Sequence, residues 1–399
     1  MKLPLAKAVI CCSIAVLLIG ASAQSLDECS AQNSSHVYCE KDIVENELDE
    51  KAQEEIIQAF NNNIQHSVEI LAATEMDIIL SNDSNILTLA NDGNMFRVKN
   101  FLDLNELVDG NINSNREIIL SPDNRYLIFA NLNEEINQKS FYYHDLENNK
   151  LVTVETDKIM DIVDDWSSNS LYYAYGNKEG ENVSLFDVKN KTTTRIAFKK
   201  EKIKEIYVTD NGSIYVKGNK KYYLDKNSNF TINEVLITGT LLGCIEEKLI
   251  YYSGGDIYFY EKGKIEKAVE VGKEFNLVNN DCNRAIFSNE NETVVYDYKE
   301  NSLNKYAFKY EQINYILFNN SSEKCLIDSD RFNAKVIGSN GQYFRIENNV
   351  MLDYIGKCKW LDCNSLIRID LDNGNRDFKI IRLNVQNSKM DMIFKRTEI

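Results

Sequence analysis

Residues 121–129, which read SPDNRYLIF, determine the fold expected for this chain. A Ser-Pro-Asp-Asn segment leads into an apolar and aromatic run, and two further runs follow, FYYHDL at 141–146 and LVTV at 151–154. Glu-Asn-Asn at 147–149 lies between the last two, and such residues tolerate the backbone conformations of tight turns. This stretch therefore predicts strand, turn, strand, turn, strand, with 117–120 as an additional strand leading in.

The same set of runs recurs along the chain at intervals of about 35–45 residues, the period of a four-stranded blade in a β-propeller. The later sets lie at 170–175, 183–187 and 194–198, at 248–252, 256–260 and 264–269, and at 284–288, 293–298 and 303–308. A β-sandwich would not need so many similar units, and a solenoid of this period would normally contain helices. Dividing residues 67–399 by the period predicts an all-β fold, a β-propeller with seven or eight blades.

The quoted stretch also resembles a known blade motif. Residues 121–129 are similar to the SPDG-type motif of TolB-like propellers and of the N-terminal propeller of dipeptidyl peptidase IV relatives. Residues 141–146 resemble the aromatic-rich strand ending in Tyr-Asp-Leu that follows in that family. Trp166-Ser167 with 171–175 resembles the start of the next blade, and Thr194-Arg195-Ile196 its close, so the similarity extends over residues 76–198. The resemblance implies a propeller.

The resemblance transfers no catalytic residue to this chain. Peptidases of that family carry an α/β-hydrolase domain with a Gly-x-Ser-x-Gly elbow, and this sequence contains no such pentapeptide. Their adjacent glutamates hold the amino terminus of the substrate, whereas Glu134-Glu135 and Glu246-Glu247 stand in other contexts here. The hydrolase domain is therefore not expected.

Residues 1–23 have the pattern of a cleavable secretory signal. Lys2 and Lys7 precede an apolar run from Ala8 to Gly20, and Ala21-Ser22-Ala23 provides small residues for a signal peptidase, so cleavage is predicted before Gln24. The alternative is an uncleaved signal anchor. Cleavage would remove two lysines and change the net charge from −16 to −18. We therefore expect a secreted protein with no integral membrane segment after cleavage.

Residues 24–66 form a separate acidic segment, distinct from the propeller at 67–399. Its first part is polar and contains Cys29 and Cys39. Apolar residues then recur at i, i+4 spacing from Asp42 to Phe60, which is typical of an amphipathic helix. A helix on the outside of the main domain is favoured over one that binds a partner.

Seven cysteines lie beyond the signal. In an exported protein, cysteines are expected to form disulfides rather than to bind metal ions. The pairs close in sequence, Cys29 with Cys39 and Cys358 with Cys363, are the disulfide candidates. Cys244, Cys282 and Cys325 are expected to be buried thiols at similar places in three units. The odd number leaves one thiol free or bridged to another molecule. Glycosylation candidates are the nine Asn-x-Ser/Thr sites at Asn33, Asn82, Asn182, Asn190, Asn211, Asn229, Asn291, Asn319 and Asn320.

Sites for cofactors, metals and catalysis are weakly indicated, and none is predicted. Only three histidines occur, no glycine-rich phosphate loop is present, and the cysteine spacings are not those of zinc sites. Asp161, Asp164 and Asp165 beside Trp166 could face a central channel, but a loop between blades is favoured. His144 is expected to be an ordinary strand histidine. Ser253 to Asp256 is expected to form a hairpin turn, and Asp370 to Gly374 a turn rather than a calcium loop.

Taken together, these features favour a secreted, non-catalytic propeller that binds a protein or a small ligand on one face, or serves as a scaffold. Binding to nucleic acid is not expected, because a strongly acidic chain repels phosphate. Two alternatives stay open. One is a hydrolase or lyase with carboxylates, and a cation, in the central channel. The other is an extracellular coat component linked through disulfides.

Overall fold

A computed structural model of the chain describes residues 50–62, 68–82, 85–93, 95–107, 118–133, 138–157, 162–179, 181–281, 283–310, 315–319, 321–328, 334–345, 358–371, 378–387 and 389–395. The predicted signal, Cys29, Cys39, Cys282, Asn33 and Asn320 lie outside these residues. The chain divides into two units, Met1–Ala59 and Phe60–Ile399. Helix α2 (Glu50–Asn62) spans the boundary and covers the end of the predicted amphipathic segment. Its buried residues Ile56, Ile57 and Phe60 have the predicted helical spacing.

The second unit contains eight antiparallel sheets of four consecutive strands within the described residues. Blades 1 to 4 are β1 (Val68–Ala73), β2 (Asp77–Asn82), β3 (Asn85–Asn91), β4 (Phe96–Asp103); β5 (Ile118–Leu120), β6 (Tyr126–Asn133), β7 (Gln138–Asp145), β8 (Lys150–Asp157); β9 (Ile162–Trp166), β10 (Tyr172–Asn177), β11 (Asn182–Asp187), β12 (Thr192–Ala197); and β13 (Glu205–Val208), β14 (Ile214–Lys217), β15 (Lys221–Asp225), β16 (Thr231–Glu234).

Blades 5 to 8 follow the same plan. They are β17 (Thr240–Ile245), β18 (Lys248–Ser253), β19 (Asp256–Glu261), β20 (Lys264–Glu270); β21 (Asn276–Asn280), β22 (Arg284–Ser288), β23 (Thr293–Asp297), β24 (Ser302–Tyr306); β25 (Tyr315–Phe318), β26 (Lys324–Asp328), β27 (Ala334–Gly338), β28 (Tyr343–Arg345); and β29 (Cys358–Trp360), β30 (Ser365–Leu371), β31 (Phe378–Asn384), β32 (Met390–Lys395). Two short elements, α3 (Leu104–Leu107) and the 3₁₀ turn η1 (Lys226–Ser228), lie between strands.

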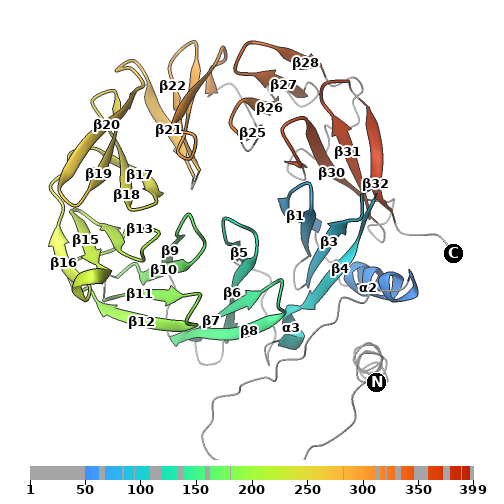
Figure 1. Cartoon of the computed structure of the whole chain (residues 1–399), viewed down its shortest axis with the longest axis horizontal. Helices are drawn as coiled ribbons and strands as arrows, with labels where there is room; N and C mark the ends of the chain where they lie inside the picture. The colour runs from blue at the N-terminus through green and yellow to red at the C-terminus, as the bar shows by residue number, and fades with distance from the viewer. Residues whose placement is uncertain are drawn as a thin grey trace, which may run out of the picture. The chain divides into compact units, whose positions relative to one another are not determined.

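The eight sheets form a ring, so the predicted propeller fold is confirmed with eight blades (Figure 1). Strands β1, β5, β9 and β13 lie toward the centre, and β4, β8, β12 and β16 lie at the outside. In an antiparallel meander, the turns between strands one and two and between strands three and four leave on the same side. We call that side of the ring the turn face.

Burial between neighbouring blades explains why the strand runs are continuously apolar. All five residues of β22 and of β23 are buried, whereas β20 at the periphery is mostly exposed. A strand covered on both faces needs apolar side chains at every position, so strict alternation is lost. Aromatic pairs fill these interfaces, as where Phe141 of blade 2 packs on Tyr175 of blade 3 with ring centroids 5.5 Å apart.

The SPDN stretch forms a hydrogen-bonded turn that recurs in other blades. In blade 2 the Ser121 hydroxyl donates to Asp123 Oδ1 (2.6 Å) and accepts from the backbone N–H of Tyr126 (3.0 Å). The Arg125 N–H also donates to Asp123 Oδ1. Asn124 has φ of 61° and Asn is one of the few side chains that tolerates this conformation. The turn thus explains Ser121, Asp123 and Asn124 of the motif.

Blades 3 and 4 repeat this turn with different residues. Ser167 takes the place of Ser121, its hydroxyl donates to Asn169 Oδ1 (2.8 Å), and the Leu171 N–H donates to the same oxygen. In blade 4 the Thr209 hydroxyl donates to Asn211 Oδ1 (2.7 Å), which also accepts from the Ser213 N–H. The turns are therefore equivalent, with Asp or Asn as the shared acceptor.

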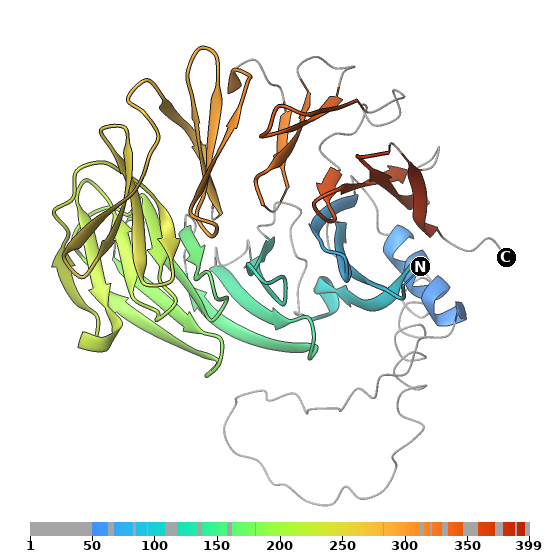
Figure 2. The same cartoon turned by 45° about the horizontal axis from the view of Figure 1, so that its top comes forward.

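Ring closure depends on packing between the first and the last blade. Blade 1 takes all four of its strands from the start of the propeller sequence, and blade 8 takes all four from its end. The two blades therefore share no strand. Strand β1 instead contacts β29 and β30, and β4 contacts β32, and the tilted view shows blade 1 beside the last blade (Figure 2). Phe60 is fully buried at this seam: its carbonyl accepts from the Asn82 side chain of blade 1, and its ring packs edge-on against Phe378 of blade 8.

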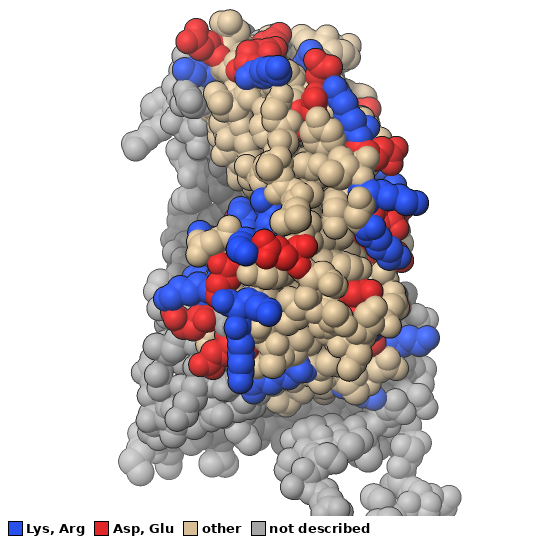
Figure 3. Space-filling model, turned by 90° about the vertical axis from the view of Figure 1, so that its left-hand side faces the viewer, with Lys and Arg blue, Asp and Glu red and all other residues tan. Residues whose placement is uncertain are grey.

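Charged side chains of both signs are mixed over the side of the ring that carries β15 to β20 (Figure 3). Pairs such as Lys220 with Glu234 (2.8 Å) and Lys262 with Glu247 (3.1 Å) join them. Exposed pairs of this kind contribute little stability. The negative charge of the chain is therefore not gathered into one field on this side.

Candidate functional site: a pocket between blades 1 and 2

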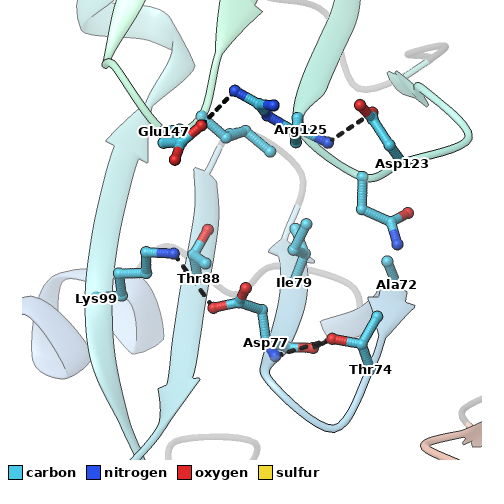
Figure 4. A pocket seen from close by; sticks show the side chains of 11 residues that line it. Ala72, Thr74, Asp77, Ile79, Thr88, Lys99, Asp123, Arg125 and Glu147 are labelled. Atoms are coloured by element: carbon cyan, nitrogen blue, oxygen red, sulfur yellow. Dashed lines mark hydrogen bonds and ion pairs between the residues drawn. The ribbon is translucent and has the colours of Figure 1, made fainter. Parts of the chain in front are cut away.

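A pocket of about 240 Å³ lies on the turn face between the first two blades (Figure 4). Blade 1 supplies side chains from β1 to β4, and blade 2 supplies its two turns on this face. The lining residues are Ala72, Thr74, Asp77, Ile79, Thr88, Lys99, Asp123, Asn124, Arg125, Leu146 and Glu147. Such a volume accommodates a single side chain or a small molecule, not an extended polymer.

Two ion pairs flank the pocket. Lys99 Nζ lies 3.3 Å from Asp77 Oδ1, and Arg125 pairs with Glu147 across the two turns of blade 2. The backbone N–H of Asp77 donates to the Thr74 hydroxyl (2.9 Å), which anchors the turn that carries this carboxylate. Hydrogen-bonded turns therefore position Asp77, Arg125 and Glu147, and strand β4 positions Lys99.

An apolar surface lies between the ion pairs. Ile79 is 3 % exposed and Leu146 is 8 % exposed, and Ala72 extends the apolar surface along β1. The Asn100 side chain donates to the Leu146 carbonyl (3.4 Å), which ties blade 1 to blade 2 beside the pocket. The arrangement suits a ligand with an apolar part and at least one charged group.

A second group of polar residues lies at the inner edge of blades 3 and 4. Two of them differ from the prediction of a loop between blades. Asp164 and Asp165 are not in a loop but in β9, the first strand of blade 3. Asp165 Oδ2 accepts from the backbone N–H of Val208 in β13 (2.9 Å) and so links the two blades. Burial raises the pKa of Asp165 to about 8. The sequence did not predict this part of β9 as a strand, because two adjacent aspartates are unusual in a strand.

The neighbours of Asp165 are already paired. The Tyr207 hydroxyl donates to Glu205 Oε2 (2.6 Å), and Glu205 also pairs with Lys217 (2.5 Å). Burial, with the nearby carboxylates of Asp165 and Asp210, raises the pKa of the Cys244 thiol well above its usual value. This thiol therefore stays protonated at neutral pH and lacks the thiolate character of a nucleophile. Among the described residues, no group of three or more His, Cys, Asp or Glu side chains is arranged to hold a metal ion.

Of the four disulfide candidates, the structure describes Cys358 and Cys363. Cys358 is 1 % exposed in β29, Cys363 is exposed in the turn before β30, and no disulfide joins them. The expectation for the central cysteines is only partly met. Cys325 is buried in the second strand of blade 7, whereas Cys244 is half-buried in the first strand of blade 5, so they do not occupy equivalent positions.

The reactivity of Cys363 tests the predicted bridge. We expect iodoacetamide to modify Cys363 in the folded protein without reductant, while fully buried Cys325 reacts only after unfolding, because burial raises its pKa and blocks access. Mass spectrometry of the alkylated peptides makes the measurement. If Cys363 reacts only after reduction, it forms a disulfide, and mapping of the unreduced peptides shows whether its partner is Cys358.

Two glycosylation candidates need correction. Asn82 and Asn319 are fully buried. The Asn82 amide donates to the Phe60 carbonyl, and Asn319 Oδ1 accepts from the Lys324 N–H (3.0 Å). A glycan on either nitrogen could not be accommodated in this packing. Asn190, Asn229 and Asn291 are exposed, and Asn182 and Asn211 are partly exposed, so these five remain candidates.

The other sequence features lie in ordinary structural positions. His144 is fully buried in β7, and Ser253 pairs with Asp256 in the predicted hairpin. Asp370 lies in β30 and pairs with Arg368 (2.9 Å), and residues 372–374 of that segment lie outside the described residues. The pocket itself was missed, because its residues gather only when two blades pack together.

No protein-family model and no curated protein matches the sequence. Similar solved structures include the β-propeller domain of the Trilobed protease from Pyrococcus furiosus, described as having an open velcro topology, with 14 % identity, 83 % of this chain and 96 % of that chain covered, and a TM-score of 0.42. Dihydro-heme d1 dehydrogenase NirN shows 12 % identity, 84 % and 80 % coverage and a TM-score of 0.48. Kluyveromyces lactis Hsv2 shows 13 % identity, 70 % and 100 % coverage and a TM-score of 0.39.

With TM-scores below 0.5, these structures assign neither a family nor a function to this chain. Within the residues described, no helix is both long enough and apolar enough to cross a membrane.

Proposed function

We propose that this protein is an exported, non-catalytic β-propeller that binds a partner at the pocket between blades 1 and 2. The observation that carries the proposal is the pocket itself, where charged side chains held by ordered turns surround an apolar surface. Propellers present such turns on a rigid ring, which lets a site form without a catalytic motif.

A catalytic channel is the second candidate, favoured by one observation. Burial keeps Asp165 protonated near neutral pH, as a general acid requires. Against this, its carboxylate already accepts from the Val208 N–H, and the adjacent Glu205 is paired with Tyr207 and Lys217. The first of these bonds joins blades 3 and 4 and the others lie within blade 4, so these groups serve the structure of the blades and binding is the better-supported function. A coat component linked through exposed Cys363 is a third possibility, which non-reducing electrophoresis tests directly.

A thermal-shift panel tests the binding function. The panel contains small cations, anions, zwitterions and sugars, and it is run on the wild type and on Ala72→Leu, which adds side-chain volume on the pocket wall. We expect at least one class to raise the melting temperature of the wild type and not of the variant, because a ligand that binds only the folded state stabilises it. If every shift is equal in both proteins, the pocket is not the binding site.

Export is tested separately, by the amino terminus of the mature protein. Because Ala21-Ser22-Ala23 follows the apolar run, we expect secreted material to begin at Gln24. Intact mass measurement of the secreted protein identifies the first residue. Protein that retains Met1 to Ala23 would rule out a cleaved signal.

We further propose a distant relationship to the TolB-like and dipeptidyl peptidase IV-type propellers. Its support is the SPDN turn and the strand ending in Tyr-His-Asp-Leu. Both features form hydrogen-bonded turns: Asp123 Oδ1 accepts from the Ser121 hydroxyl, and Asp145 Oδ1 accepts from the N–H groups of Glu147 and Asn148. The proposed relationship therefore concerns architecture and brings no activity with it.

A further inference from the structure

The charges of the pocket do not balance. Lys99 pairs with Asp77 and Arg125 pairs with Glu147, which leaves Asp123 as a third carboxylate. Asp123 is exposed, and no ion pair joins it to another described side chain. The pocket therefore carries one negative charge in excess at its rim.

The turn does not require that negative charge. Asp123 Oδ1 accepts from the Ser121 hydroxyl and the Arg125 N–H, and in blades 3 and 4 the neutral amides of Asn169 and Asn211 accept the same two bonds. Either residue thus supports the turn, and of these three blades only blade 2, whose turn lines the pocket, has a carboxylate at this position. Its charge is available for a ligand.

Apolar side chains lie beside this carboxylate. Ile79 and Leu146 form an apolar wall within a pocket of about 240 Å³. Lysine and arginine combine an aliphatic stem with a cationic head, and they place the stem along apolar surface while the head stays polar. The net charge of −16 also attracts basic proteins and speeds their encounter.

We infer that the pocket binds a lysine or arginine side chain of a basic partner protein, with the stem against Ile79 and Leu146 and the cationic head at Asp123. The inference rests on the proposed function, since it assigns a ligand class to the same pocket. The ion pairs on either side define where the stem can lie, and the excess carboxylate selects a cation.

Capped, fluorescein-labelled peptides of glycine with three spaced lysines are suitable probes, compared with arginine, norleucine and glutamate versions. Fluorescence anisotropy at low salt gives each dissociation constant. We expect Asp123→Asn to weaken the lysine and arginine peptides about threefold to fivefold, the effect of one partly exposed charge pair. The matched control Glu247→Gln removes the same charge from a turn of blade 5 on the same face, and it should leave binding within about twofold.

A zero-length carbodiimide cross-link locates the bound amine. The lysine peptide should couple to Asp123, and the cross-linked fragment should be absent from the Asp123→Asn protein. An unchanged melting temperature of this variant shows that the turn is intact, as expected from Asn169 and Asn211.

The outcomes separate the inference from the proposed function. Equal binding of the basic peptides to wild type and Asp123→Asn, or cross-links only elsewhere, overturns the inference. If the glutamate or norleucine peptide binds instead and Ala72→Leu abolishes that binding, the pocket is a binding site for another ligand class. If no peptide and no compound of the thermal-shift panel binds in a way that depends on Ala72, both fail.

Discussion

Replacing Phe60 with alanine should destabilise the propeller by roughly 3–5 kcal/mol, the cost of removing a fully buried aromatic side chain. Phe60 is 0 % exposed and packs on Phe378, which stacks in turn on Phe394 with centroids 5.4 Å apart. Both partners belong to blade 8, whereas the Phe60 carbonyl is held by Asn82 of blade 1. The substitution therefore weakens the junction between the first and the last blade.

The location of the damage is more informative than its size. Phe287→Ala is the matched control, because Phe287 is also fully buried but lies in β22 of blade 6, away from the junction of blades 1 and 8. Hydrogen exchange should show early loss of protection in β1 and β29 for Phe60→Ala, and not for Phe287→Ala. Chemical denaturation gives the free energy of unfolding of both. If the two variants lose protection in the same strands, Phe60 is an ordinary core residue and not a closure device.

Asn82→Ala should affect the same seam by a different route. The Asn82 side chain is fully buried, donates to the Phe60 carbonyl and accepts from the Asn85 amide (2.9 Å). Removing it leaves a buried carbonyl and a buried amide without these bonds, at a cost of about 1–3 kcal/mol for each such group. A seam effect of Asn82→Ala without a global change in structure would support the same closure mechanism.

The strand runs predicted for blades 2, 3, 5 and 6 coincide with observed strands, and the reason is local. The continuous run at 126–129 and the turn residues Ser121, Asp123 and Asn124 determine their own backbone conformation through neighbouring side chains. The blade number stayed between seven and eight because blade starts are unevenly spaced. Val68 and Ile118 are 50 residues apart, whereas Glu205 and Thr240 are 35 apart.

The site and the seam depend on contacts that no local pattern reports. Asp77 and Arg125 come from different blades, and only the docking of blade 2 on blade 1 places them around one pocket. Phe60 has the spacing of an ordinary helix residue, so its position at the junction could not be foreseen. Asp165 was assigned to a loop because its hydrogen-bond donor, the Val208 N–H, lies 43 residues away.

Asp165 and His144 should give this protein opposing responses to pH. Asp165 has a pKa of about 8 in the folded state, against about 3.9 in an unfolded chain. The folded state therefore holds this proton more tightly, so its contribution to stability is fully present below pH 4 and is lost as the pH rises toward 8.

His144 is 0 % exposed, and burial lowers its pKa to about 4, against about 6.5 unfolded. Its contribution is fully present above pH 6.5 and is lost as the pH falls toward 4.

Between pH 4 and 6.5 the two contributions have opposite slopes, each up to about 1.4 kcal/mol per pH unit. They should largely cancel in the wild type, so single substitutions should reveal them. Asp165→Asn retains an oxygen for the Val208 N–H but cannot ionise, and we expect it to leave stability unchanged near pH 4 and to raise it by roughly 2 kcal/mol at pH 8. This value allows for partial exposure of the carboxyl, which reduces the effect.

His144→Leu should show the mirror-image profile. The variant has no group to protonate in either state, and leucine suits a strand position between Leu127 and Leu151. Relative to the wild type, its free energy of unfolding should rise as the pH falls from 6.5 to 4 and should be level above pH 7. Urea denaturation at intervals across this range gives both difference curves.

Asp256→Asn serves as the contrasting control. A hydrogen bond from Lys267 lowers the pKa of Asp256, so removing this carboxylate should cost stability at neutral pH rather than add it. Parallel curves for Asp165→Asn and the wild type would mean that Asp165 is ionised in the folded protein, and its link to blade 4 would then be a charged hydrogen bond.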